Sequence, residues 1–229
     1  MKNQFRFSLL FILALSIISC KEKATEATDA NAVASAEGTK FVADPAATKI
    51  SWEGSKPAGN HMGTINLTQG EVFVTDGNIT AGSFTLDMST ITVTDLQGDE
   101  KASLEGHLKG TAKDGVEDFF NTAKYPTAKF EVTSVAPATD VPGANVNVTG
   151  NLTLLEITKS ITFPATVTVA ENNVSVSTNP FTINRTDWGI KYGSKTFFDN
   201  LADKFIDDNI TLQISLAATK EATEAAPAQ

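Results

Sequence analysis

The stretch that decides the fold is VNVTGNLTLLEITKSITFPATVTV, residues 146–169. Apolar residues recur at every second position on both sides of a tight turn: Val146, Val148, Leu152 and Leu154 before it, and Ile161, Phe163, Val167 and Val169 after it. A period of two places these side chains on one face of a strand and the intervening polar groups on the other. The pattern predicts two long antiparallel strands with one face toward an apolar interior and one toward water. It leaves open whether side chains fill that interior or a ligand occupies it.

Similar alternation elsewhere predicts about eight strands in total, at spacings that suit an up-and-down barrel or a sandwich. The further strands are Lys49–Gly54, Gly70–Val74, Asn78–Met88, one that begins with Phe130 and Val132, Val174–Arg185, and Asn209–Leu216. Asp76-Gly77 is typical of a hairpin turn. Two stretches break the pattern. Residues 95–121 have helical character at 101–108 and 116–120, and the spacing of apolar residues in 197–205 predicts a short helix.

The N-terminus has the pattern of a bacterial lipoprotein signal. Lys2 and Arg6 precede the apolar run Phe7–Ile18, which is too short to span a bilayer, and Ser19-Cys20 follows. We expect residues 1–19 to be a signal peptide and Cys20 to carry lipid. This places the protein in the bacterial cell envelope, anchored to a membrane on its periplasmic or outer-membrane face. The alternative is an ordinary secretory signal followed by a stray cysteine. Cys20 is the only cysteine, so no internal disulfide is expected.

The two flanks of the folded unit differ from it in composition. Residues 20–38, which begin with the lipidated cysteine, contain almost no bulky apolar residue and cannot offset their ordering entropy by burial. We expect a disordered tether there, and a disordered tail at 219–229, where the same Ala/Thr/Glu composition returns. Residues 39–218 contain no linker long enough to divide them and are predicted to form one β-barrel domain.

The net charge of the chain argues against polyanionic partners. Without residues 1–19, which hold Lys2 and Arg6, the basic count falls from 18 to 16 against 27 acids, so the mature chain carries about −11. Such a charge opposes binding to nucleic acid and to anionic lipid surfaces. Attachment to a membrane is therefore expected through the lipid anchor alone.

The sequence contains no catalytic constellation. His61 and His107 have no second metal-type residue at ligand spacing, and no phosphate loop or nucleophile elbow is present. A lipid hydrolase would need a nucleophile beside a base, and no convincing pair is found. We expect no enzyme, no catalytic residue, no metal and no cofactor beyond a bound isoprenoid lipid or quinone. His61 has either a structural role or a polar contact at a barrel mouth. Arg185 either pairs with an acid such as Asp187 or contacts a ligand.

Phenylalanine dominates the aromatic residues, with 14 Phe against two Tyr and two Trp. An ordinary core would absorb those on strands, whereas those on the two insertions suggest lids over a barrel end: Phe119, Phe120, Phe197, Phe198 and Phe205. Eight-stranded barrels either fill with side chains or enclose one small ligand, and these aromatic residues are compatible with both.

Taken in order, these residues resemble the YceI-like family of lipocalin-shaped polyisoprenoid-binding proteins. The resemblance covers essentially the whole folded unit and rests on Ser51–Gly54, Gly82–Met88, His107-Leu108, Asp118–Asn121, Tyr125-Pro126, Phe130, Gly150–Leu154, Thr158-Lys159, Arg185–Ile190 and Asp207–Leu216. It implies an all-β, eight-stranded antiparallel lipocalin-like barrel with short helical insertions, an elongated apolar cavity and no general catalytic activity. Glu156 stands where relatives often have glycine, so the turn at 155–158 is expected to differ in shape.

The resemblance implies a protein that sequesters or carries a long-chain amphiphilic lipid: a polyisoprenoid, an isoprenoid quinone or a fatty-acid derivative. The headgroup would lie near one barrel end. The alternative is a non-enzymatic structural, interaction or stress protein of the envelope with a filled barrel. A homodimer is compatible with either. The candidate ligand-binding residues are Phe84, Leu86, Met88, Phe119, Phe120, Phe130, Leu152, Leu154, Phe163, Phe181, Trp188 and Phe198.

Overall fold

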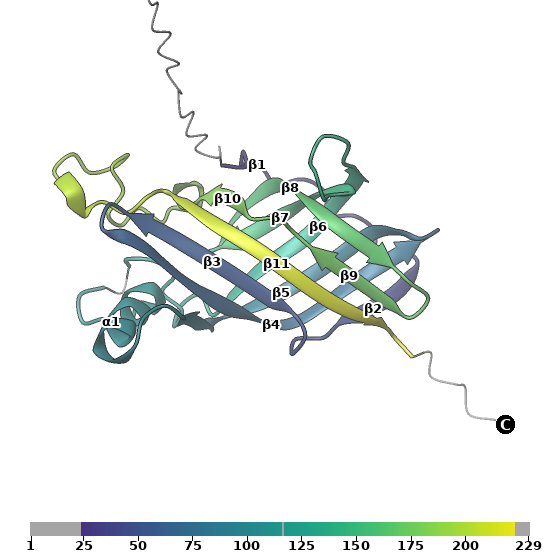
Figure 1. The fold of residues 1–229 in the computed structure, drawn as a ribbon, viewed down its shortest axis with the longest axis horizontal. Helices are drawn as coiled ribbons and strands as arrows, with labels where there is room; N and C mark the ends of the chain where they lie inside the picture. The colour runs from purple at the N-terminus through teal and green to yellow at the C-terminus, as the bar shows by residue number, and fades with distance from the viewer. Residues whose placement is uncertain (1–23, 116, 223–229) are drawn as a thin grey trace, which may run out of the picture.

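Antiparallel strands surround a long interior (Figure 1). The computed structural model describes residues 24–115 and 117–222. The strands are β1 (Thr28–Asp29), β2 (Thr39–Ala43), β3 (Lys49–Lys56), β4 (Gly59–Thr75), β5 (Asn78–Val93), β6 (Thr127–Pro137), β7 (Val146–Leu154), β8 (Ile157–Val169), β9 (Asn173–Ser177), β10 (Phe181–Asn184) and β11 (Asn209–Lys220). The helices of the described ranges are α1 (Gly98–Lys109) and the short 3-10 turns η1 (Arg185–Trp188) and η2 (Ala202–Lys204).

Eight of these strands close into a ring. Neighbours pair in the order β3, β4, β5, β6, β7, β8, β9 and β11, and β11 pairs with β3 to close it. Beyond the end of β3, β2 lies between β4 and β11, and beyond the end of β9, β10 lies along β11. The predicted all-β, lipocalin-like fold with a ring of eight antiparallel strands is confirmed.

The stretch 146–169 forms the hairpin β7–β8, whose register is unbroken along its whole length. Leu155 and Glu156 in the turn have φ of 49° and 68°. Positive φ at both central residues is the mark of a type I′ turn, whose twist matches that of the flanking strands. Glu156 therefore adopts a conformation that favours glycine. The predicted turn at Asp76-Gly77 has the same feature, with φ of 51° and 76°.

Strand β4 is much longer than the predicted Gly70–Val74, because it begins at Gly59. Its first half contains several polar residues and two shifts of register against β5, one between Thr64 and Asn66 and one between Leu67 and Gln69. Gly63, Ile65 and Leu67 are buried at every second position, but after the second shift the buried positions resume at Gly70, so the period of two changes phase. The predicted strand begins only after this change of phase, although the backbone of the first half pairs on both edges.

The three helical stretches predicted in the two insertions are confirmed only in part. Residues 101–108 are helical, within α1, but 117–120 form turns and bends, and residue 116 lies outside the described ranges. The segment 197–205 contains only the short turn η2 in place of the predicted helix, and Ala202, where η2 begins, has φ of 46°, outside the right-handed helical region. The single strand predicted for 174–185 divides into β9 and β10 before Pro180, which has no N–H to donate to a sheet.

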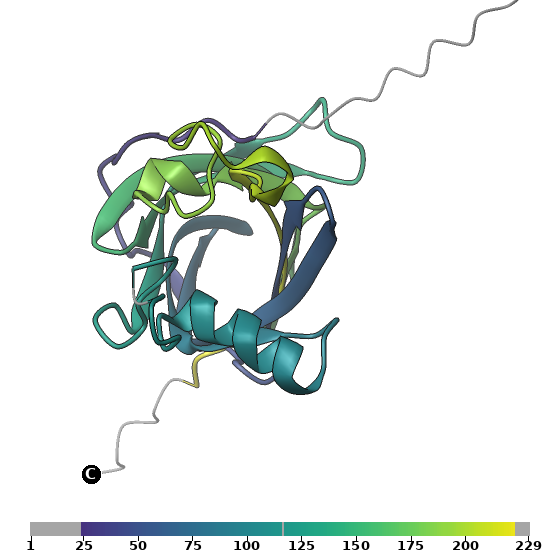
Figure 2. The same cartoon turned by 90° about the vertical axis from the view of Figure 1, so that its left-hand side faces the viewer.

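The beginning of the described chain runs around the outside of the ring (Figures 1 and 2), where a disordered tether is expected. We call residues 24–34 the N-terminal strap. The Thr25 N–H donates to the carbonyl of Thr182 in β10, at 2.6 Å. Strand β1 then pairs with β8, with Thr28 opposite Ser160. Farther along, the Ala34 N–H donates to the carbonyl of Val132 in β6, at 3.1 Å.

Polar side chains on the outer face of the hairpin hold the strap. The Asn31 N–H donates to Asn151 Oδ1 at 2.9 Å, Asn151 Nδ2 donates to the Asn31 carbonyl at 2.8 Å, and Asn31 Nδ2 donates to Ser160 Oγ at 2.9 Å. Asn151 and Ser160 are 4% and 3% exposed, although the alternation places them on the face predicted to meet water. Composition alone does not reveal these partners, so the strap from residue 24 onward differs from the expected tether.

The ring has two different ends. Helix α1 and the segment 185–206 lie at one end, on opposite sides of the ring (Figure 2). The other end contains the β4–β5 turn. At the C-terminus β11 continues to Lys220, beyond the predicted boundary at 218, because its last residues pair with β2 and β9. No helix of residues 24–115 and 117–222 is long and apolar enough to cross a membrane.

Candidate functional site

The ring encloses two apolar cavities in series. The inner cavity, of about 130 Å³, is lined by strand residues, and threonines supply its only polar side chains. The outer cavity, of about 180 Å³, lies at the α1 end. Both are lined by Ile50, Leu86, Leu152 and Leu212, so these four side chains form the boundary between them. Each cavity is many times the volume that one water molecule needs. The interior is therefore not filled with side chains.

An aromatic wall runs along the inner cavity. Phe163 stacks on Phe181 with 4.5 Å between ring centroids, and Phe130 lies 5.5 Å from Phe163. Phe130 can lie against the sheet because its diagonal neighbour in the adjacent strand is Gly150, where an added Cβ would come within 2.3 Å of Phe130 Cζ. The glycine thus allows a large ring to fit beside the backbone and leave the cavity open.

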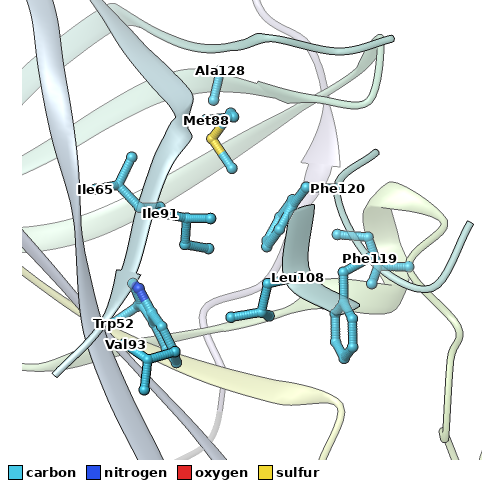
Figure 3. Close-up of a cluster of buried hydrophobic side chains, with 10 residues drawn as sticks. Trp52, Ile65, Met88, Ile91, Val93, Leu108, Phe119, Phe120 and Ala128 are labelled. Atoms are coloured by element: carbon cyan, nitrogen blue, oxygen red, sulfur yellow. The ribbon is translucent and has the colours of Figure 1, made fainter. Parts of the chain in front are cut away.

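Side chains from the ring and from the insertions meet around the outer cavity (Figure 3). Trp52 and Met88 come from β3 and β5, Leu108 from the end of α1, and Phe119 and Phe120 from the loop that follows it. The Phe120 N–H donates to the Leu108 carbonyl at 3.1 Å, which attaches the loop to the helix. The prediction that aromatic residues of the first insertion cover a barrel end agrees with this arrangement.

Basic side chains occur only in the outer of the two cavity linings. Lys56, His61 and Arg185 belong to it, and the inner lining has none. His61 Nδ1 lies 2.8 Å from Asp95 Oδ2, and the Met62 N–H donates to the other carboxylate oxygen at 2.9 Å. Burial alone would raise the pKa of Asp95, but the hydrogen bonds from Met62 and His61 outweigh it, so the pKa lies below its ordinary value. This pair fixes the start of β4 beside the outer cavity.

Arg185 is 1% exposed, and its guanidinium donates hydrogen bonds to oxygens of the protein. Its guanidinium donates to the carbonyls of Ile190, Asp207 and Ile206 at 2.9, 3.1 and 3.2 Å, and to Asp208 Oδ1 at 3.4 Å. Burial lowers its pKa, and the charges of Asp208 and Asp207 oppose that effect. The residue joins η1 to the chain entering β11. Of its two predicted roles, the ion pair is present, with Asp208 instead of Asp187.

His107 has a similar structural position. Its Nδ1 lies 2.6 Å from Asp118 Oδ2, and its ring stacks on Tyr192 with 6.1 Å between centroids. This contact connects α1 to the segment 185–206 across the end of the ring. Within the described ranges, no group of three His, Cys, Asp or Glu side chains is placed to hold a metal ion.

All but two of the predicted ligand-binding residues line a cavity. Phe84, Leu86, Phe130, Leu152, Phe163 and Phe181 border the inner one, and Leu86, Met88, Phe119, Phe120, Leu152 and Leu154 border the outer one. The two exceptions have different causes. Trp188 is fully buried and donates its Nε1–H to the Leu152 carbonyl at 2.9 Å, so it belongs to the wall behind the cavity. Phe198 is 49% exposed, because 197–205 does not form the predicted helix.

Several lining residues are missing from the predicted set, and Trp52 and Ile50 are the most informative. Both lie on the inward face of β3 at a spacing of two, a pattern visible in the sequence. Leu212 and Ile214 of β11 follow the same rule. The period of two along β3 and β11 is sufficient to predict these residues. A selection that favours phenylalanine misses them.

Comparison with known proteins agrees with the fold. The profile of the YceI-like domain matches residues 41–218. The chain belongs to the YceI-like family. This is a family of binding proteins and is not known for enzymes. A search of curated proteins finds no significant match.

Two solved structures show how far the YceI-like fold is shared. BcnA of Burkholderia cenocepacia superposes with a TM-score of 0.59 at 21% identity, covering 77% of this chain and 99% of that one. A polyisoprenoid binding domain from Saccharophagus degradans, described as implicated in plant cell wall breakdown, gives a TM-score of 0.58 at 16% identity, covering 81% of this chain and 100% of that one. At these identities, the similarity shows a shared fold and nothing beyond it.

Proposed function

We propose that this YceI-like protein binds a long-chain amphiphilic lipid in its two cavities and sequesters or carries it. The observation that carries the proposal is the pair of adjoining cavities with almost wholly apolar walls. Burial of apolar surface contributes about 25 cal/mol per Å², so a long hydrocarbon chain gains most by leaving water for such a space. The polyisoprenoid-binding relative supports an isoprenoid chain, and a quinone or a fatty-acid derivative has the same physical requirements.

The lining suggests the orientation of the lipid. Charged and polar groups near Lys56 and His61 belong to the outer cavity, so the headgroup lies at the α1 end. The tail then passes Ile50 and Leu152 into the inner cavity, whose aromatic wall offers only hydrocarbon contact. The opposite orientation would leave the headgroup with Thr48 and Thr178 as its only polar neighbours, which is costly for a group that needs several hydrogen bonds.

Delivery or storage of a lipid also fits the proposed location. We propose that residues 1–19 are a signal peptide and that Cys20 carries the lipid anchor in the cell envelope. Both lie outside the described ranges. A binding protein tethered to a membrane would exchange its cargo with that membrane without crossing bulk water. Labelling of the expressed protein with a radioactive fatty acid, and loss of the label in Cys20→Ala, would test the anchor.

Native mass spectrometry tests the cargo. The protein is extracted from cells under mild conditions, and bound species are released and weighed. Leu152→Trp places a large side chain at the boundary of the two cavities and is expected to abolish retention, whereas Val42→Trp, at an exposed position of β2, should retain it. A wild-type protein that carries no lipid and also fails to bind added geranylgeraniol, decylubiquinone or palmitic acid would refute the proposal.

A further inference from the structure

The segment between η1 and β11 exposes aromatic side chains. Within the described ranges, three large aromatic side chains are exposed, and all of them lie in this segment: Tyr192, Phe197 and Phe198, at 43%, 45% and 49%. We call these three residues the aromatic patch. Single apolar residues are common on protein surfaces, but three aromatic residues within seven positions of one segment indicate a contact surface.

Hydrogen bonds hold the two phenylalanines of the patch outward. The Phe198 and Phe197 N–H groups donate to the carbonyl of Ser194 at 3.0 and 3.2 Å, and Ser194 is fully buried. The Thr196 hydroxyl donates to Asp208 Oδ2 at 2.6 Å, which joins the same turn to the residue before β11. The rings are therefore exposed by a bonded turn, and their exposure does not come from a lack of attachment.

Lysine side chains lie over aromatic rings of this segment. Lys191 Nζ is 4.6 Å from the centre of the Phe197 ring, and Lys195 Nζ is 3.5 Å from that of Phe205. Residues 190–206 contain three lysines and two aspartates, so the segment is slightly positive in an acidic chain. This combination suits a membrane surface, where aromatic rings enter the hydrocarbon boundary and ammonium groups on long stems reach the phosphates.

The patch adjoins the outer cavity. Arg185 and Ile206, at the two ends of the segment 185–206, both line that cavity. Tyr192 meets Phe119 of the same lining edge to face, with 5.6 Å between ring centroids. A surface that receives the patch would therefore lie close to the end of the ring at which we place the headgroup of the lipid.

The beginning of the strap lies on the same side of the ring as the patch. Thr25 bonds to Thr182 in β10, and β10 leads directly into η1 and the segment 185–206. In both views of the molecule the start of the strap and this segment occupy one side of the ring (Figures 1 and 2). Cys20, the proposed site of the anchor, is only five residues before Thr25. An anchor there would bring the bilayer to the patch.

We propose that the aromatic patch docks on a lipid bilayer and holds the outer-cavity end of the ring against it. The inference rests on the proposed function, because the anchor keeps the patch near the membrane and a lipid cargo gives the contact its use. The negative charge of the whole chain opposes attraction to anionic lipid, so apolar side chains supply the contact. The cargo then passes between bilayer and cavity without crossing bulk water.

Quenching by brominated lipid tests the contact. Cys20 is the only thiol of the chain, so residues 20–229 can be coupled through it to maleimide-bearing phosphatidylethanolamine in phosphatidylcholine vesicles, whether or not a cell attaches lipid there. Phe198→Trp places a reporter in the patch, and Val42→Trp places one on β2, at the opposite end of the ring (Figure 1). The native tryptophans are buried, and the unsubstituted protein gives the background.

We expect the emission of Phe198→Trp to shift to shorter wavelength on the vesicles and to be quenched by brominated phosphatidylcholine, because the indole enters hydrocarbon. Val42→Trp should show neither change. Equal quenching of both reporters, or quenching of neither, would overturn the inference. A shift that appears without vesicles and grows with protein concentration would show that a second copy of the chain covers the patch, which also overturns it.

A double variant separates the docking surface from the cavity. Phe197→Ser combined with Phe198→Ser removes both rings and leaves the cavity linings intact. Before coupling, it should bind the fluorescent probe N-phenyl-1-naphthylamine as the wild type does. After coupling, hydrogen exchange of residues 190–206 should be slowed by the vesicles in the wild type only. Equal slowing in both proteins would overturn the docking surface alone, whereas a wild type that docks and carries no lipid would overturn the proposed function alone.

Discussion

Arg185 illustrates how one side chain fixes a part of the molecule that has little regular structure. Its guanidinium satisfies three backbone carbonyls of a segment without α-helix or sheet, and it carries a charge balanced by Asp208. The same residue packs over the ring of Phe119, 5.7 Å from its centroid. The end of the ring that carries the outer cavity therefore depends on it for its shape.

We predict that Arg185→Met lowers the free energy of unfolding by about 3 kcal/mol or more, because it leaves buried carbonyls without donors. Urea unfolding followed by tryptophan fluorescence measures the loss. Arg185→Lys keeps the charge but cannot reproduce the planar fork, so an intermediate loss is expected. A Met variant as stable as the wild type would contradict this account of the segment.

At Gly150 the absence of a side chain leaves room for the ring of Phe130. We predict that Gly150→Ala destabilises the protein by about 1–3 kcal/mol, a typical cost of overpacking, since the new Cβ would displace Phe130. Displacement into the inner cavity should also reduce uptake of N-phenyl-1-naphthylamine. Gly54→Ala is the matched control for stability, because nothing lies within 4 Å of its added Cβ. Equal behaviour of the two variants in thermal unfolding would argue against a role for Gly150 in seating the ring.

The pKa of Asp95 gives a dependence on pH. Because the folded-state pKa lies below the ordinary value of 3.8, ionised Asp95 stabilises the fold above that value, and its contribution disappears as the pH falls through the folded pKa. We predict that Asp95→Asn lowers stability at pH 7 and that its difference from the wild type shrinks below about pH 4. Urea titrations at pH 7, 5 and 3 measure this trend. A difference that stays constant with pH would show that the carboxylate charge is not involved.

At the level of elements, the N-terminal strap is the feature with the most unusual position. It lies against β10, β8, β7 and β6 from outside, and it contacts β8 and β10 where these two strands do not pair with each other. The strap thus supplies hydrogen bonds at the seam where the ring would otherwise have open strand edges.

We predict that Asn151→Ala releases the strap, because the Asn151 side chain accepts from the Asn31 N–H and donates to the Asn31 carbonyl, and alanine can do neither. Hydrogen exchange measured by mass spectrometry should show the amides of Thr25 and Ala34 protected in the wild type and rapidly exchanging in the variant. Val33→Ala, which shortens an exposed side chain of the same segment, should change nothing. Rapid exchange of Thr25 and Ala34 in the wild type would mean that the strap is not held.

Elements with a regular period were predictable, and those fixed by particular partners were not. The hairpin β7–β8, the turn at Asp76-Gly77 and most of the ring follow from alternation and turn chemistry, whereas the positive φ of Leu155 and Glu156 does not. The first half of β4 was not predicted because a shift of register between Leu67 and Gln69 changes the phase of its alternation. The contact between the strap and the ring was not predicted, because it depends on Asn151 and Ser160, which are distant in sequence.

The cavity was predictable to a similar extent and for similar reasons. Alternation placed Leu152, Phe163 and their neighbours on the interior face, and the sequence still left a filled interior and a hollow one equally open. Whether the interior is filled or hollow depends on how side chains pack across the ring. Gly150 and Gly63 matter as much there as the large residues, because each lets an aromatic ring lie against the sheet.

At the level of the whole molecule, occupation of the cavities should be visible as stability. A ligand that binds only the folded state at 100 times its dissociation constant adds about 2.7 kcal/mol. We predict that farnesyl acetate raises the thermal unfolding temperature of the wild type and has no such effect on Leu152→Trp. A rise of equal size in both proteins would place the ligand outside the two cavities.

The strap also determines how freely the protein could move above a membrane. An unattached tether of residues 21–38 would let the ring wander roughly 25 Å from its anchor and turn in any direction. With Thr25 bonded to β10, only residues 21–24 separate it from Cys20, and the five steps from Cys20 to Thr25 reach at most about 18 Å. If Cys20 holds the anchor, the strap shortens the free part of the tether and limits how far the ring can turn. The side of the ring that carries Thr25 then stays toward the bilayer, and the cavity meets the membrane in a similar orientation each time.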